Sequence, residues 1–162
     1  MLPTFRKSIE VINKNGTVYI NPQARVKGGL RISTDPVFIL PWNELTKLEK
    51  FDYIKKAFEH SIEGVEMPSN INDFSKERLE KYGVKNWGQL LKGAKQCNIT
   101  LLEAEYKFTP MRYDGKGSEG IKAWIKIIPI NASSEEIVKM LEKCLDQSIE
   151  PYFEEDLPPR SP

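Results

Sequence analysis

The run from Gly115 to Gly120, which reads GKGSEG, is the residue pattern with the most definite chemical meaning. It matches G-x-G-x-x-G, in which glycines let the backbone approach a dinucleotide pyrophosphate at the start of a helix. That chemistry needs a strand before the glycines and a helix after them, whereas a strand-like run, Ile121 to Ile130, follows here. The glycine run is therefore interpreted as a flexible hairpin loop that could contact a partner, and no cofactor is expected.

Histidine and cysteine form no catalytic or metal-binding pattern. His60 is the only histidine, and no nucleophile motif surrounds a serine or a cysteine. Cys97 and Cys144 lie far apart without a CxxC pair, which favours two reduced, packed thiols over a metal site or a disulfide. We predict that the protein is not an enzyme, although side chains from distant positions could still converge into an active site.

The net charge of +1 conceals two oppositely charged ends. Residues 1–34 hold six Arg and Lys against one acid, whereas residues 132–156 hold eight acids against two lysines. This segregation is consistent with a partner chosen by electrostatics, and equally with two solvated faces. The basic end includes Phe5 and Tyr19, a mixture that single-stranded nucleic acid can use, but no nucleic-acid motif accompanies it. Basic residues that protect a sheet edge from aggregation explain the same pattern.

The length of 162 residues suits one α+β domain over residues 1–150, followed by an acidic and then proline-rich tail at 151–162. No run approaches the roughly 20 apolar residues that a membrane helix requires. The N-terminus also lacks the apolar stretch of a secretory signal. A cytoplasmic protein is therefore expected, without a membrane partner.

The first part of the chain predicts strands and then helices. Asn15-Gly16 lies between two β-rich runs and predicts a hairpin, and Gly28-Gly29 predicts a second turn. Pro36 and Pro41 enclose a short apolar run that suits an edge strand. Helices are then expected over three segments, the first ended by Gly64 and followed by a loop over 63–72. These segments are 43–63, 75–82 and 86–95.

The second part returns to strand character over 97–105 and 106–111. Isoleucines at period two, together with Trp124, predict that Ile121 to Ile130 is a strand at the centre of the sheet. Ser133 and Glu136 form a capping-box pattern for a last helix over 135–149. The order of these elements predicts an α+β fold, a mainly antiparallel sheet with helices 43–63 and 135–149 packed on it.

Several segments, taken together, resemble the contact-dependent growth inhibition immunity proteins over residues 8 to 149. The segments are Asn15-Gly16-Thr17-Val18-Tyr19-Ile20, Gly29-Leu30, Pro36-Val37-Phe38-Ile39-Leu40-Pro41, Lys85-Asn86-Trp87 with Ala94-Lys95, and Phe108-Thr109-Pro110. The resemblance implies a small cytoplasmic bacterial protein that binds and neutralises a toxin domain delivered by neighbouring cells. It implies binding rather than catalysis, so it transfers no catalytic residue.

The expected partner is thus a cognate toxin domain, with a nuclease as the leading target, because nuclease inhibitors commonly present acids to a basic cleft. The alternative is a small RNA- or ligand-binding protein that uses the basic N-terminal region. Acids on the last helix and the tail are the predicted toxin contacts: Glu135, Glu142, Asp146, Glu150, Glu154, Glu155 and Asp156. A competing set lies on the long helix: Glu44, Glu49, Asp52 and Glu59. The sequence leaves the oligomeric state open.

Overall fold

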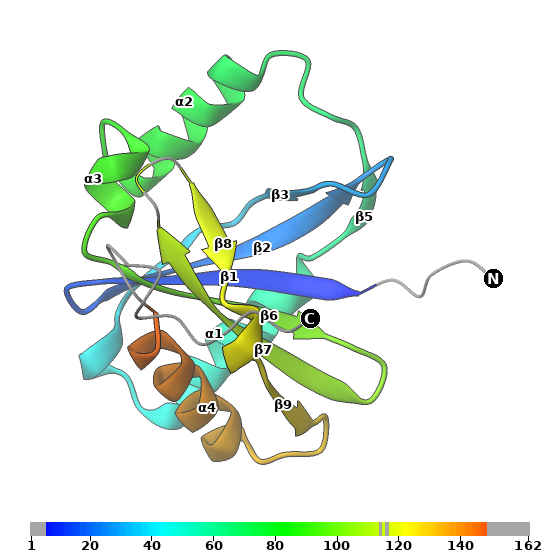
Figure 1. Ribbon diagram of the computed structural model, residues 1–162, viewed down its shortest axis with the longest axis vertical. Coiled ribbons are helices and arrows are strands. Elements are labelled where there is room, and N and C mark those ends of the chain that lie inside the picture. Colours follow the sequence, from blue (N-terminus) through cyan, green and yellow to red (C-terminus); the bar gives the residue numbers. More distant parts are fainter. Residues whose placement is uncertain (1–5, 114, 116, 149–162) are drawn as a thin grey trace.

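The computed structural model describes residues 6–113, 115 and 117–148, and within these residues nine strands form one sheet (Figure 1). The strands are β1 (Lys7–Lys14), β2 (Thr17–Val26), β3 (Arg31–Ser33), β4 (Phe38–Pro41), β5 (Glu63–Val65), β6 (Lys95–Leu101), β7 (Glu105–Tyr113), β8 (Ser118–Gly120) and β9 (Lys126–Pro129). The helices are η1 (Trp42–Glu44), α1 (Lys47–Glu59), α2 (Ile71–Tyr82), α3 (Trp87–Leu91), η2 (Lys122–Trp124) and α4 (Ser134–Asp146). The strand order is β3-β2-β1-β6-β7-β8, with β4 and β5 on β2 and β9 on β7. The expected α+β fold is confirmed.

The two hairpins expected near the N-terminus are both present. Asn15 (φ 54°) and Gly16 (φ 91°) take the positive φ values that a tight turn between β1 and β2 requires. Gly28 and Gly29 connect β2 to β3 in the same conformation. The apolar run between the two prolines becomes the short strand β4 on β2. Local turn chemistry therefore set the pairing in this half of the sheet.

The prediction of a central strand from Ile121 to Ile130 is wrong. Ile121 leads into the turn of η2, so β9 is the part of this segment that pairs in the sheet, with the first half of β7. The second half of β7 pairs with β8, which precedes the segment. Ile127 is 54% exposed, so one side of β9 faces solvent. The central strands are β1 and β6, which join the N-terminal and later strands into one sheet. Apolar periodicity marks an extended segment but does not rank strands by position in the sheet.

The long helix is shorter at both ends than the expected 43–63. It begins at Lys47, because Thr46 and Glu49 form a capping box at its N-terminus. It ends at Glu59 with His60 as its C-cap, and the expected stop signal Gly64 lies instead in β5. Backbone pairing with Arg25 and Val26 of β2 turns part of the expected loop over 63–72 into a strand.

The middle helices also differ in their ends. Helix α2 begins four residues earlier than expected, because the Asn70 side chain accepts a hydrogen bond from the Asp73 amide. Gly83 ends it in the left-handed conformation, as expected. Helix α3 is capped by Asn86 but ends at Leu91, and Lys95 already belongs to β6. The strand bounds move accordingly, since β6 ends at Leu101 and β7 continues to Tyr113.

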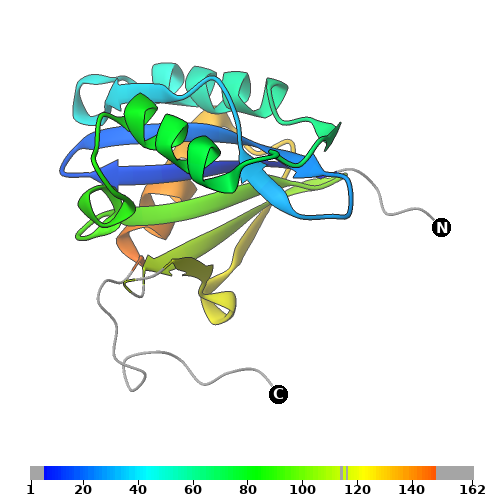
Figure 2. The ribbon, with the colours of Figure 1, turned by 90° about the horizontal axis from the view of Figure 1, so that it is seen from above.

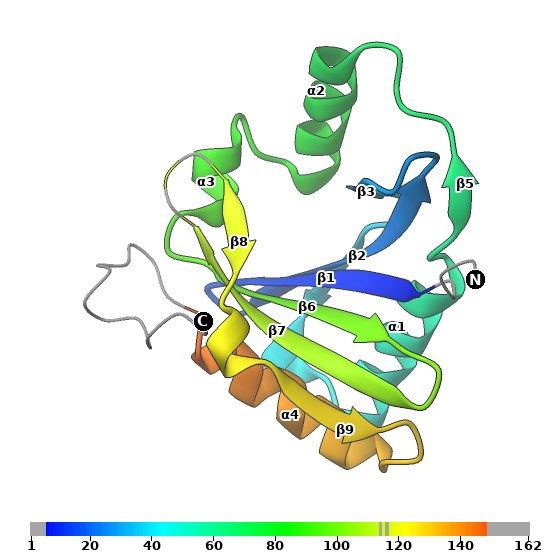
Figure 3. The same ribbon diagram turned by 45° about the vertical axis from the view of Figure 1, so that its right-hand side comes forward.

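Helices α1 and α4 cover one face of the sheet, and α2 with α3 lies against the other (Figure 3). Viewed from above, α2 in green passes in front of the strands and α4 in orange lies behind them (Figure 2). Ser133 caps α4 by accepting a hydrogen bond from the Glu136 amide, although the helix ends at Asp146 rather than 149. The main core lies between the sheet and the α1/α4 layer. Its fully buried members include Ile9, Val11, Ile20, Ile54, Ile99, Phe108, Ile137 and Leu141.

Candidate functional site

The sheet face turned away from α1 and α4 is polar across its four longest strands. Residues directly opposite each other in neighbouring strands share a face, so the strand register defines two polar rows. One row is Gln23, Ser8, Thr100 and Lys107, and the next is Asn21, Glu10, Asn98 and Thr109. We call these eight residues the polar face. A large polar surface in the middle of a sheet must be hydrogen-bonded or contact a polar partner.

Hydrogen bonds within the first row order its side chains. The Ser8 hydroxyl donates to Gln23 Oε1 at 2.8 Å and lies 3.5 Å from Thr100 Oγ1. Ser61 supports the same position from the chain after α1, because its hydroxyl accepts from the Ser8 amide and donates to the Gln23 carbonyl. Ser8 and Thr100 are buried, whereas Gln23 and Lys107 keep part of their surface exposed. This row is therefore rigid and still accessible at its ends.

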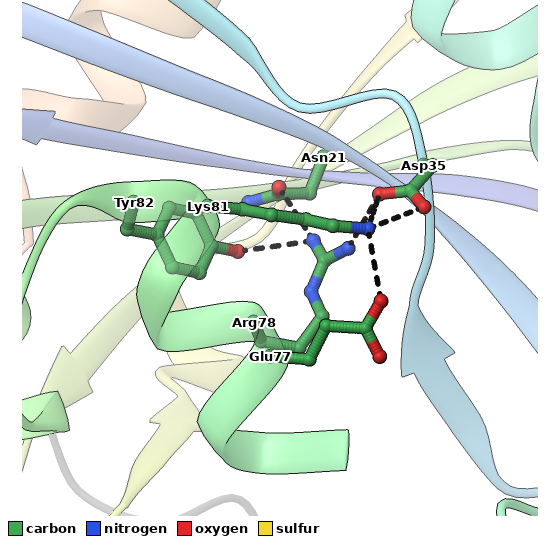
Figure 4. Close-up of polar contacts among 6 residues, drawn as sticks. All are labelled: Asn21, Asp35, Glu77, Arg78, Lys81 and Tyr82. Carbon is green, nitrogen blue, oxygen red and sulfur yellow. Dashed lines mark hydrogen bonds and ion pairs between the residues drawn. The ribbon is translucent and has the colours of Figure 1, made fainter. Parts of the chain in front are cut away.

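Arg78 of α2 attaches the second row to the helix (Figure 4). Its guanidinium donates to Asn21 Oδ1 at 3.0 Å, to Asp35 Oδ1 at 3.1 Å and to the Tyr82 hydroxyl at 3.4 Å. Lys81 approaches the same Asp35 carboxylate at 2.6 Å. Arg78 is only 3% exposed, so its bond to the buried Asn21 stabilises α2 against the sheet from inside the protein, while its partner Asp35 stays exposed.

Glu10 is the acidic group of the polar face. Burial raises the pKa of its carboxyl group, while the positive charge of Arg78 and a contact with Asn21 lower it. Burial also raises the pKa of Tyr82 to about 12, and the negative charge of Glu10 adds to that shift. A carboxylate beside a buried guanidinium makes this part of the face electrostatically mixed, suited to recognising another polar surface.

Two buried amide atoms on this side of β6 have no hydrogen-bond partner among the described residues: Gln96 Nε2 and Asn98 Oδ1. Gln96 stands two residues before Asn98 on the same strand, and its Oε1 accepts from the Ser118 hydroxyl of β8 at 2.8 Å. An unsatisfied buried polar atom costs about 1–3 kcal/mol.

An apolar cluster closes one end of the polar face, where α2 and α3 pack on the sheet. Ile12, Tyr82, Leu90 and Ala94 form its buried centre. Tyr82 meets Tyr19 edge to face at 5.6 Å, and Trp87 lies 5.8 Å from Tyr82 on its other side. The cluster covers the aromatic end of β2 and leaves the two polar rows beside it.

The predicted acidic contacts of α4 lie on the opposite layer and are paired within the protein. Glu135 meets Lys47 at 3.3 Å, Glu142 meets Lys50 at 3.4 Å and Asp146 meets Lys95 at 2.9 Å. These ion pairs connect α4 to α1 and to the sheet. Four further acids of that set, Glu150, Glu154, Glu155 and Asp156, lie outside the described residues, as does the predicted tail at 151–162.

The competing acids lie in η1 and α1, beside α4. Glu44, Asp52 and Glu59 are exposed. Glu49 is exposed too, but its carboxylate accepts from the Thr46 amide, a bond that lowers the pKa of Glu49. The described acids of the two sets thus lie on one helical layer, and Glu135 and Glu142 are paired with lysines of α1.

The remaining motifs have ordinary structural positions. Ser118 to Gly120 of the glycine run form β8, which leads into η2 rather than a long helix, while residues 114 and 116 lie outside the described part. His60 is the exposed C-cap of α1. Cys97 and Cys144 are free and buried with their Sγ atoms 2.7 Å apart, and burial raises the pKa of Cys97. In the described ranges, no three His, Cys, Asp or Glu side chains are grouped to hold a metal ion.

The polar face itself was not predicted as a site, although a signal for it exists in the sequence. In β1, Ser8 and Glu10 alternate with Ile9 and Val11. In β6, Gln96, Asn98 and Thr100 alternate in the same way with buried residues. Such alternation usually indicates a solvated sheet face, and only the register shows that polar residues of four strands align.

The fold is thus an α+β sheet with α1 and α4 on one face and, on the other, a polar and partly accessible area beside α2 and α3. The chain belongs to the CDI immunity protein family, whose family model matches residues 8–148 and thereby confirms the resemblance seen in the sequence. No curated protein sequence matches it. Within the described residues, every helix is too short or too polar to span a bilayer.

Two of the solved structures that are similar in fold illustrate the relationship. One is a protein of unknown function, NMB0488 from Neisseria meningitidis, with a TM-score of 0.73 and 18% identity, covering 92% of this chain and 100% of the other. The second is a chain of a CdiA-CT/CdiI toxin and immunity complex from Yersinia pseudotuberculosis, with a TM-score of 0.65 and 15% identity, covering 90% of this chain and 99% of the other. At these identities the likeness concerns the fold.

Proposed function

We propose that this protein is a cytoplasmic immunity protein that binds and neutralises the toxin domain of a contact-dependent growth inhibition system. The family match over residues 8–148 carries the proposal, and one of the two similar structures comes from a toxin and immunity complex. The protein acts by binding and has no turnover of its own. The toxin is a nuclease, a choice supported by the excess of acids in residues 132–156, which suits a basic nucleic-acid-binding cleft.

The polar face is the contact surface that the geometry supports best. It offers donors and acceptors on a sheet, and its side chains Gln23, Lys107 and Thr109 keep part of their surface exposed, so a toxin segment laid across it could form hydrogen bonds with them. The acids of α4 form a second candidate surface. Because Glu142 and Asp146 already pair with lysines, they are placed at the rim of a contact, where charge mainly affects the rate of encounter.

The decisive experiment uses the toxin domain encoded beside this gene. Calorimetry should give a one-to-one complex, and the protein should abolish nuclease activity of the toxin. Asn98→Ala should weaken the complex by about 1–3 kcal/mol, roughly 5- to 150-fold, because the variant leaves a donor of the toxin unpaired. The matched control Asn43→Ala, outside the polar face, should bind like the wild type. Equal binding by both variants would exclude the polar face as the contact.

The acidic surfaces are compared by charge reversal. Glu142→Lys with Asp146→Lys should slow association, and the effect should shrink at high salt. Glu49→Lys with Asp52→Lys is the matched pair on α1. Unchanged rate and affinity in the folded first variant would remove α4 from the interface. His60→Ala should leave protection intact, whereas its loss in a folded variant would make His60 a contact or catalytic residue.

A further inference from the structure

Two arginines lie side by side where the polar face reaches β3. Arg25 of β2 and Arg31 of β3 are directly opposite in the register, so their side chains share a face. Arg25 stands two residues after Gln23 on the same strand, and the intervening Ala24 is buried on the other side. The arginine pair, as we call Arg25 and Arg31, therefore continues the polar face at its β3 end.

Like charges directly opposite in a sheet destabilise it, and this pair has a third neighbour of the same sign. Partial burial lowers the pKa of Arg31, and the positive charges of Arg25 and of Arg6 lower it further. Nearby carboxylates do not neutralise the positive charge of these three arginines. Glu63 reaches Arg25 only at 3.8 Å, and the ion pairs of the described residues include no partner for Arg6 or Arg31.

The turn between β2 and β3 shows that the unbalanced positive charge is confined to the arginines. Lys27, two residues after Arg25, has its own carboxylate, Glu66, at 2.5 Å. The described part of the chain thus supplies an acid for the lysine at the turn but none for Arg31. An arrangement that costs stability in the free protein is expected where a ligand of opposite charge compensates for it.

We propose that the arginine pair binds a carboxylate on an acidic segment of the toxin, an inference that rests on the proposed immunity function. Planar guanidinium groups bind carboxylates through two parallel hydrogen bonds, which gives direction as well as attraction. The adjoining polar face then holds the rest of the segment through its amides and hydroxyls. The toxin segment bound here is acidic.

The observations favour an acidic polypeptide over nucleic acid. Binding of single strands combines basic residues with aromatic rings on which bases stack. The aromatic residue of the polar side of β2, Tyr19, is covered by Tyr82 at 5.6 Å.

The test uses the full chain with three probes: the co-encoded toxin domain, a fluorescent octaglutamate peptide and an octauridine RNA. Arg25→Gln with Arg31→Gln should weaken toxin and octaglutamate binding at least about tenfold at low salt and reduce the salt dependence. Lys55→Gln with Lys56→Gln, an exposed pair on α1, is the control and should change binding less than about twofold. Arg31→Lys keeps the positive charge but loses the planar guanidinium with its paired donors, so its binding should be weakened less than in the double arginine variant and more than in the control.

Circular dichroism establishes that each variant folds, and the arginine variant should melt no lower than the wild type because it relieves repulsion. Toxin binding that is equal in the arginine variant and the wild type overturns the inference and leaves the immunity function standing. Arginine-dependent binding of octaglutamate without toxin binding supports the carboxylate site and refutes the immunity function. Tighter binding of octauridine than of octaglutamate overturns the inference in favour of nucleic acid.

Discussion

Replacing Arg78 by Met should detach α2 from the sheet, because it removes the charge that holds the helix while keeping an apolar stem of similar length. The guanidinium is almost fully buried and donates to Asn21, Asp35 and Tyr82 at 3.0–3.4 Å. Hydrogen bonds that involve a charged group contribute about 1.5–3 kcal/mol each. Asn21 would lose its buried charged donor, whereas the Asp35 side chain is 59% exposed and keeps Lys81. We expect the free energy of unfolding to fall by about 1.5–3 kcal/mol.

Lys81→Met is the matched control on the same helix. Lys81 contacts the same Asp35 carboxylate, but its side chain is 32% exposed and that of Asp35 59% exposed. Exposed ion pairs contribute about 0.2–1 kcal/mol. The expected losses in free energy of unfolding therefore differ several-fold, although both variants remove a cation bound to Asp35. The difference between the two losses measures the effect of burial rather than of charge.

Urea unfolding followed by circular dichroism measures the free energy of unfolding, and hydrogen exchange locates the change. In Arg78→Met, amides of α2 should exchange faster than those of α1, because α1 packs on the other face of the sheet. Since a domain of this size is stable by about 5–15 kcal/mol, the variant should still fold at low temperature. A loss below about 1 kcal/mol, equal to that of Lys81→Met, would refute the view that this network holds α2.

Three further outcomes are expected. The pKa of Glu10 is raised above 4.5 in the folded protein, so the free energy of unfolding should fall as the pH rises from 4.5 through that folded pKa. Glu10→Gln should remove this fall. Urea unfolding at pH 4.5 and at pH 7.5 measures it. Gly120→Ala should lower the free energy of unfolding by about 1–3 kcal/mol, because the added Cβ would lie 2.8 Å from Thr109 Cγ2. The added Cβ of the control Gly117→Ala meets nothing within 4 Å. Equal melting temperatures of the two variants would contradict this reasoning. The buried Cys97 should react with a thiol reagent only as fast as the protein opens, and immediate labelling of the native protein would show that it is accessible.

Local patterns in the sequence were sufficient wherever a few neighbouring residues decide the conformation. Asn15-Gly16 and Gly28-Gly29 predicted both hairpins, since positive φ values are a local requirement. Asn86 and Ser133 predicted two helix starts, because a cap forms with an amide three residues away. The family resemblance, carried by such segments, was confirmed as well.

The errors arose where a segment needed a distant partner to define it. Ile121 to Ile130 has the apolar pattern of a central strand, yet β7 can accept only β8 and β9 along its remaining edge, so the segment breaks into a turn and a short edge strand. Glu63 to Val65 has no strand pattern of its own and becomes β5 only because β2 offers it backbone partners. Hydrogen bonding between strands is non-local, and composition alone does not determine it.

The sequence by itself determined which residues carry charge, which can start or end a helix, and which alternate along a strand. Only the tertiary structure decided that the acids of α4 meet Lys47, Lys50 and Lys95, and that the polar residues of four strands form one face. Only it placed Arg31 beside Arg25. The physical reason is that a strand has two faces and two edges, and its register with its neighbours, set by packing of the whole sheet, decides which side chains meet.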